Sequence, residues 1–142
     1  MNIREANIRD YDILVALWRS AGLPFKPHGR DMRENIEKEL ARGCAHFLIA
    51  EEKGRPVGTI LVTHDGRKGW INRLAVIPAY RNRGIARMLV EKGEKILDDA
   101  GIGIIACLIE DYNRESLAVF QKLGYIDFKG MHYLTKRQHP EV

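Results

Sequence analysis

An apolar run that turns directly into an amphipathic helix, at residues 74–87, sets the narrowest limit on how this chain can fold. Residues 74–76 are expected to end a buried strand, Pro78 leads out of it, and a long helix begins near Gly84. The first N–H groups of such a helix have no carbonyl partner within it, and its dipole adds positive partial charge at the same end. The turn therefore predicts an anion site suited to a diphosphate.

Three arginines, Arg81, Arg83 and Arg87, flank this turn with no acidic residue between them. Gly84 lets the backbone approach a ligand, and the small Ala86 leaves room beside it. An ordinary helix start with solvated arginines accounts for the same residues, so the physical pattern by itself leaves both interpretations open.

Apolar periodicity and turn residues predict the other elements. Strands are expected at residues 1–6, 45–51, 57–64, 70–77 and 102–109, with one or two more within 125–135. Helices are expected after the N-cap Asn7, after a capping pair formed by Asp31 and Glu34, from Gly84 to Gly101, and after the N-cap Asn113. The fully apolar run 102–109 indicates a strand buried on both faces. This order predicts an α/β or α+β sandwich whose mixed sheet is covered on both sides.

Length and composition favour a cytoplasmic globular protein. The chain has 142 residues, 45% of them hydrophobic and 30% charged. No apolar run approaches the ~20 residues that span a bilayer, so no membrane partner is expected. Cys44 and Cys107 are expected to be buried thiols of a reducing compartment. The net charge of +4 (23 basic minus 19 acidic residues) is too small to indicate nucleic acid. No metal is expected, because the Cys44-x-His46 pair lacks a second pair.

Two motifs resemble those of the GNAT superfamily of N-acetyltransferases. Arg81-x-x-Gly84-x-Ala86 resembles the signature (Gln/Arg)-x-x-Gly-x-(Gly/Ala) that follows an apolar strand in that family. The stretch from Glu110 to Tyr125 resembles the second motif, in which an Asn, a short helix and a Gly-(Phe/Tyr) pair follow the fifth strand. The resemblance covers about residues 1–136. It implies one N-acetyltransferase domain over 1–142, with a GNAT-like mixed, mostly antiparallel sheet of six to seven strands flanked by four helices.

The resemblance also implies acetyl-coenzyme A (acetyl-CoA) as co-substrate. Backbone groups of residues 74–76, near the end of the strand predicted at 70–77, would bind the pantetheine arm and the acetyl carbonyl. The N–H groups of residues 82–87 would bind the pyrophosphate. Side chains of the second motif would hydrogen-bond the pantetheine and line the far side of the cofactor. The implied cofactor-binding residues are Leu74, Ala75, Val76, Arg81, Asn82, Arg83, Gly84, Ile85, Ala86, Arg87, Asn113, Ser116, Phe120 and Lys122.

The family transfers the acetyl group directly to an amine of a protein, peptide or small molecule, and this chain departs from its pattern at two catalytic positions. Phe120 stands where many members carry an acidic tyrosine, and Leu108 stands where some carry a glutamate. Glu110 is the candidate base, because it shares a face with Leu108 if the strand runs that far; a solvated carboxylate at a strand end is the alternative. Tyr112 is a candidate proton donor. An N–H near Val76 is expected to stabilise the oxyanion.

The acceptor site is predicted in the irregular segment 22–31, with Phe25, His28 and Arg30 joined by Trp70 as contacts of the acceptor. A merely stiffened connection explains the two prolines of that segment equally well. Because the two catalytic positions depart from the family pattern, a catalytically impaired acyl-CoA-binding sensor or partner module is the alternative function. Monomer and homodimer are both compatible with the sequence.

Overall fold

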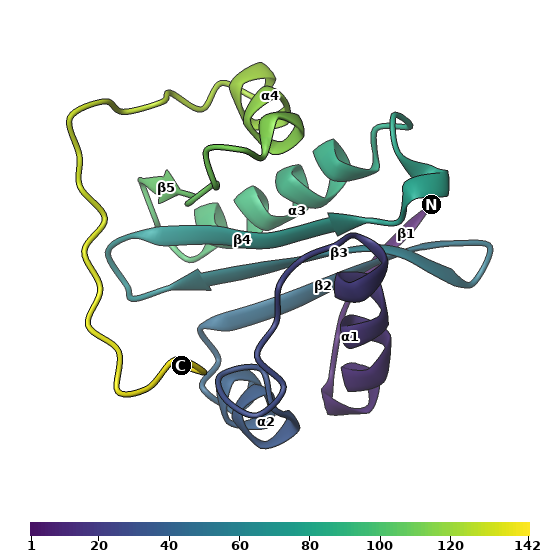
Figure 1. Ribbon diagram of the computed structural model, residues 1–142. Coiled ribbons are helices and arrows are strands. Elements are labelled where there is room, and N and C mark those ends of the chain that lie inside the picture. The colour runs from purple at the N-terminus through teal and green to yellow at the C-terminus, as the bar shows by residue number, and fades with distance from the viewer.

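A five-stranded sheet forms the middle layer of the protein (Figure 1). The computed structural model describes residues 1–142. The strands lie in chain order: β1 (Asn2–Glu5), β2 (Ala45–Glu52), β3 (Arg55–His64), β4 (Gly69–Val76) and β5 (Ile105–Ala106). Strands β1 to β4 are antiparallel to their neighbours, whereas β5 is parallel to β4. The predicted mixed, mostly antiparallel character of the sheet is thus confirmed, but the sheet has five strands and not the six to seven expected.

Four helices cover the sheet, two on each face (Figure 1). On one face lie α1 (Tyr11–Ser20) and α2 (Arg33–Ala41), and on the other lie α3 (Ile85–Asp99) and α4 (Arg114–Lys122). Two short 3₁₀ turns, η1 (Ile8–Asp10) and η2 (Pro78–Tyr80), precede α1 and the loop before α3. No helix of the chain has both the length and the apolar character that a bilayer crossing requires.

Side chains along a strand alternate between the two faces of the sheet, and in the central strands the residues on both faces are apolar and buried. On β2, Leu48 and Ala50 join the apolar cluster under α3 and α4. Their neighbours Phe47 and Ile49 join the second cluster, which contains Leu14, Trp18 and Ile36 of α1 and α2. The sheet therefore separates two cores and holds both in place.

The start of the first helical segment matches its prediction. The Asn7 side chain accepts a hydrogen bond from the Arg9 N–H at 2.9 Å, and Asp10 accepts one from the Asn7 N–H at 2.9 Å. These two bonds form a capping box.

The capping pair predicted for α2 is wrong. Met32, not Asp31, occupies the N-cap, and no side chain caps this helix. The Asp31 carboxylate is buried and accepts a hydrogen bond from the Lys26 N–H at 2.7 Å instead. It also lies 3.6 Å from Arg73 and 3.7 Å from Arg30. A buried carboxylate is stabilised more by nearby guanidinium groups than by a helix end at the surface.

The C-terminal third contains fewer strand residues than predicted. The strand expected at 102–109 is limited to β5, and it is not buried on both faces, because Ile104 and Leu108 are 56% and 52% exposed. Residues 125–135 form no strand. They run past the sheet toward α2 (Figure 1), where the Arg30 N–H reaches the Glu141 carbonyl. With only two paired residues, β5 offers too short a hydrogen-bonding ladder to hold another strand.

Candidate active site

Strands β4 and β5 separate soon after they meet, and the gap between them opens into a cavity of about 460 Å³. The two strands pair only where Gly69 and Trp70 face Ile105 and Ala106. One wall of the cavity is residues 72–74 of β4. The opposite wall is the stretch that follows β5, together with one side of α4: Cys107, Leu108, Ile109, Glu110, Asn113, Ser116 and Phe120.

A β-bulge gives β4 its unusual backbone beside this cavity. Thr59 pairs with Ala75 and Leu61 pairs with Asn72, so that both Arg73 and Leu74 stand opposite a single residue of β3. Arg73 has φ 54, a left-handed conformation that costs a residue other than glycine roughly 1–3 kcal/mol. Such strain is concentrated at functional sites, and here it lies on the cavity wall.

The N–H of Val76 points to the open side of β4. The Ile77 N–H donates to the Val57 carbonyl at 2.9 Å, so the preceding residue, Val76, forms a non-hydrogen-bonded pair with Gly58. The Val76 carbonyl accepts a hydrogen bond from Arg81 Nε at 3.0 Å. No carbonyl of the chain accepts a hydrogen bond from the Val76 N–H. A backbone donor is thus left at the uncovered edge of β4.

The turn into α3 presents six further backbone donors. Gly84, at φ 80, is the N-cap, and Asn82 also has a left-handed φ of 62. None of the N–H groups of residues 82–87 donates a hydrogen bond within the chain. A Cβ added to Gly84 would meet nothing within 4 Å, so glycine is required here by the backbone conformation and not by crowding within the chain.

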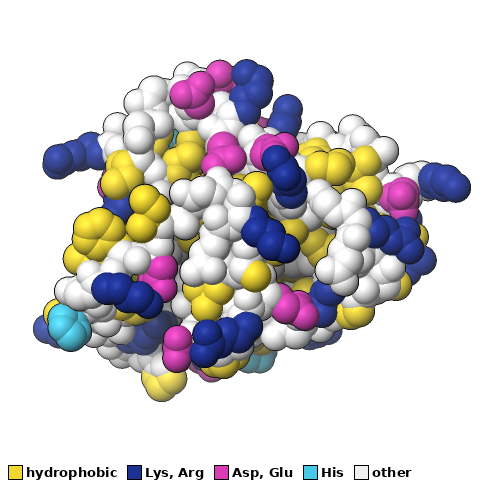
Figure 2. Space-filling model, turned by 90° about the horizontal axis from the view of Figure 1, so that it is seen from above, with side chains coloured by type: hydrophobic (Ala, Val, Ile, Leu, Met, Phe, Trp, Pro, Cys, Tyr) yellow, Lys and Arg dark blue, Asp and Glu magenta, His cyan; other side chains and the backbone are white.

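The three arginines of this loop have partners of their own. Arg81 holds the Val76 carbonyl, Arg83 lies 3.8 Å from Glu52, and Arg87 bonds Glu91 at 2.7 Å. The two ion pairs are weak, so the positive charges of Arg83 and Arg87 can be redirected to a bound anion. Basic and acidic side chains are interspersed on the face seen in Figure 2, with no continuous patch of one sign.

Helix α4 places its predicted side chains against the cavity, with one exception. The Asn113 side-chain oxygen accepts a hydrogen bond from the Ser116 N–H at 3.2 Å, so it caps the helix while its NH₂ group keeps its donors. Phe120 is 4% exposed and packs edge-on against Tyr125 at 5.0 Å. Lys122 is exposed and does not line the cavity.

Among the predicted catalytic residues, Glu110 lines the cavity and Tyr112 does not. The strand does not extend to Glu110, but Leu108 and Glu110 both reach the cavity from the stretch after β5. Tyr112 is 77% exposed. Burial raises the pKa of the Cys107 thiol to about 11, so this cavity residue is protonated at neutral pH and is a poor nucleophile.

Of the four predicted acceptor contacts, only Arg30 lines the cavity. Phe25 packs on Trp18, with ring centroids 6.3 Å apart, and His28 is exposed on the same segment. Trp70 lies near the start of β4 with the Lys68 ammonium 4.9 Å from its ring centroid.

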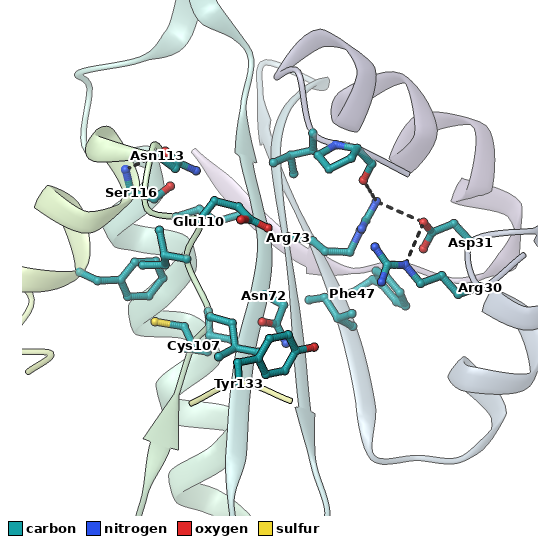
Figure 3. A pocket seen from close by; sticks show the side chains of 18 of the residues that line it. Arg30, Asp31, Phe47, Asn72, Arg73, Cys107, Glu110, Asn113, Ser116 and Tyr133 are labelled. Atoms are coloured by element: carbon teal, nitrogen blue, oxygen red, sulfur yellow. Dashed lines mark hydrogen bonds and ion pairs between the residues drawn. The ribbon is translucent and has the colours of Figure 1, made fainter. Parts of the chain in front are cut away.

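Sequence reasoning missed three charged residues of this cavity, Asp31, Arg73 and Glu39. Arg73 and Asp31 form an ion pair on the cavity wall (Figure 3). Burial raises the pKa of Glu39 on α2. The one available sequence signal for a charged cavity residue was Arg73 itself, the only charged side chain in the mostly apolar run 70–77. Glu39 gave none, because α2 is polar along most of its length.

A splayed strand pair, an uncovered strand edge and a donor-rich helix start together suit an extended ligand that ends in a diphosphate. The sequence profile described as the acetyltransferase (GNAT) family matches residues 11–125. An acetyltransferase of Photorhabdus laumondii is 35% identical over 127 residues, which are 89% of this chain and 87% of that protein. The chain therefore belongs to the GNAT acetyltransferase family and is an acyltransferase.

Solved structures of similar fold include three acetyltransferases. The structure of AAC(6')-Iy in complex with the bisubstrate analogue CoA-S-monomethyl-acetylneamine has a TM-score of 0.79 at 20% identity, and the match covers 96% of this chain and 97% of that chain. A predicted acetyltransferase of Clostridium acetobutylicum with acetyl-CoA has a TM-score of 0.77 at 22% identity, with 97% and 99% covered. PaiA N-acetyltransferase of Thermoplasma acidophilum, in complex with coenzyme A, has a TM-score of 0.75 at 21% identity, with 86% and 87% covered. At these identities the likeness establishes the fold.

Proposed function

We propose that this chain is a single-domain N-acetyltransferase, spanning residues 1–142, that transfers the acetyl group of acetyl-CoA directly to a primary amine. The observation that carries the proposal is the run of six backbone N–H groups at residues 82–87, none of which has an acceptor within the chain. The first N–H groups of a helix have no carbonyl partner within it, and a diphosphate at the start of α3 would accept hydrogen bonds from them. Reduced thiols at Cys44 and Cys107 suit the proposed cytoplasmic location.

The pantetheine arm would run from this turn along the uncovered edge of β4. Asn113 would donate its NH₂ group to the arm, and Phe120 would provide an apolar surface for it. At the end of the arm, the Val76 N–H would donate to the acetyl carbonyl. This donor strengthens its hydrogen bond as negative charge develops on that oxygen, which is how a fixed backbone N–H lowers the barrier to acyl transfer.

The amine would be deprotonated by Glu110. Its carboxylate would take one proton from the amine as the nitrogen bonds to the acetyl carbon, the carbon–sulfur bond breaks, and the sulfur of coenzyme A leaves as a thiolate that takes up a proton. An alkyl thiolate has a pKa near ~8.5, so it departs without a strong acid. Phe120 therefore does not prevent the reaction, although a positioned acid would add roughly 10²–10⁴-fold.

Release of free coenzyme A thiol, measured over a panel of amines, tests this proposal. We expect amine-dependent release with at least one acceptor, and a decrease in kcat of about 10²-fold in Glu110→Gln. The matched control is Glu37→Gln, which removes an exposed acid of α2 that does not line the cavity. Tight acetyl-CoA binding without amine-dependent release from any acceptor would contradict the enzyme and favour the acyl-CoA sensor.

A further inference from the structure

One wall of the cavity contains Arg30, Asp31 and Arg73 and is here called the acceptor wall. The chain provides hydrogen-bond partners for only part of the Arg73 guanidinium. Arg73 is 15% exposed and lies 4.1 Å above the Trp18 ring. Its Nη2 donates to the Pro24 carbonyl at 3.2 Å and lies 3.6 Å from Asp31, while its Nε is buried without a hydrogen-bond partner. An orphaned, charged donor on a strained residue is costly to the fold, and a function at this position would explain why it is kept.

The charges on this wall do not cancel. Arg30 and Arg73 share a single buried carboxylate, that of Asp31, so two positive charges face one negative charge. That carboxylate is 6% exposed and also accepts the Lys26 N–H, so it is not free to bind a cationic ligand. The other acid of the cavity, Glu39, forms no ion pair with either arginine, and burial raises its pKa.

The opposite wall carries the complementary charge. Figure 3 shows the Glu110 carboxylate directed into the cavity, on the side away from Arg30 and Asp31. An acceptor between the walls would thus have the Glu110 carboxylate on one side and the guanidinium pair on the other. The cavity of about 460 Å³ would also receive the end of the acetyl donor, so only a small group fits between the two walls.

We infer that the acceptor is a small zwitterion of the amino-acid type, whose amine faces Glu110 and whose carboxylate binds Arg73 and Arg30. This inference rests on the proposed function. Guanidinium groups bind carboxylates through charge-assisted hydrogen bonds, and a bidentate pair also fixes the orientation of the ligand. Binding of the carboxylate to the accessible part of the guanidinium pair would hold the amine at the β4 edge, where the acetyl carbonyl is expected.

Thiol release with matched acceptors tests the inference. The probes are alanine, serine, methionine and lysine, each compared with its own amide, and spermidine as an amine without a carboxylate. We expect at least one free amino acid to exceed its amide by about 10-fold or more in kcat/KM. Amides have the more acidic ammonium group and therefore more free amine, so intrinsic reactivity does not explain a preference for the carboxylate.

Two variants test whether the guanidinium groups cause the preference for amino acids over their amides. Arg73→Gln is expected to abolish the preference, and the matched control Arg67→Gln, in the turn between β3 and β4, to keep it. If Arg73→Gln does not fold, Arg30→Gln at the exposed edge gives the same test, with KM raised for the amino acid and unchanged for its amide. Equal rates with amino acids and amides, or turnover of spermidine alone, would overturn the inference and leave the N-acetyltransferase intact. No thiol release with any amine would overturn both.

Discussion

At the scale of single residues, paired charges and left-handed backbone positions shape the site more than apolar packing does. Arg73 illustrates this, since its backbone is strained by the bulge and its side chain is held by Trp18, Pro24 and Asp31. The sequence motif predicted the strand-to-helix turn at Gly84, because glycine is needed there for its backbone conformation alone. It did not predict the pairing of Asp31 with Arg73, because the two residues are far apart in sequence and have no shared motif.

Gly84→Val tests the loop conformation. A β-branched residue at φ 80 costs about 1–2 kcal/mol and would displace the N–H groups around it. We expect the Kd for coenzyme A, measured by calorimetry, to rise at least 10-fold. Gly66 has φ 87 in the turn between β3 and β4, also with nothing within 4 Å of an added Cβ. Gly66→Val should therefore lose similar stability with an unchanged Kd, and equal effects of both variants on binding would refute our placement of the diphosphate.

The Arg4–Asp10 pair gives stability a defined pH dependence. Arg4 donates to both Asp10 oxygens at 2.9 Å, and these bonds lower the pKa of the buried carboxyl. A lowered folded-state pKa means that the stabilisation is present above the unfolded value near ~3.9 and is lost as the pH falls through the folded value. Asp10→Asn should cost about 2 kcal/mol at pH 7 in urea unfolding, and the difference from wild type should shrink below about pH 4.

Glu37→Gln, which removes an exposed acid from α2, is the control for this prediction and should change stability little at either pH. A cost of Asp10→Asn that stays constant from pH 7 to pH 3 would show that the ion pair does not stabilise the fold.

At the scale of elements, the sequence predicted most boundaries because local signals set them. Asn7, Gly84, Gly101 and Asn113 lie at or next to helix ends, as the capping patterns indicated. Strand length was less predictable. Residues 102–109 are apolar throughout, but how many of them pair depends on where β4 diverges, which is a property of the assembled sheet.

Asn113 combines a structural and a ligand role that two substitutions separate. Asn113→Asp keeps an oxygen to cap α4, whereas Asn113→Ala removes the cap and should cost about 1 kcal/mol. Both variants lose the NH₂ donors, so both should raise the KM for acetyl-CoA, while only the alanine variant lowers the melting temperature. A normal KM in Asn113→Asp would show that the residue serves only as a cap.

At the scale of the whole molecule, the sheet joins two cores that lie behind different parts of the proposed site. The cluster under α3 and α4 lies behind the loop proposed to bind the cofactor, and the cluster under α1 and α2 lies behind the wall proposed to bind the acceptor. Because both clusters share the same strands, neither is expected to persist when the other is lost, and unfolding should be a single cooperative transition.

Leu14→Ala and Leu89→Ala test this coupling, since each side chain is fully buried in a different cluster. Each should cost about 2–5 kcal/mol. The two do not touch, because the sheet lies between them, so the double variant should equal the sum within about 0.5 kcal/mol. Separate unfolding transitions in the single variants, followed by fluorescence and circular dichroism, would show that the two cores fold independently.

A crystal structure of the protein with bound coenzyme A would decide whether the strand-to-helix turn holds the donor. We expect the diphosphate within hydrogen-bond distance of the N–H groups of residues 82–87, with the pantetheine beside β4 and its sulfur near Val76. Coenzyme A ordered elsewhere, with those N–H groups still free of any contact, would contradict the proposed site.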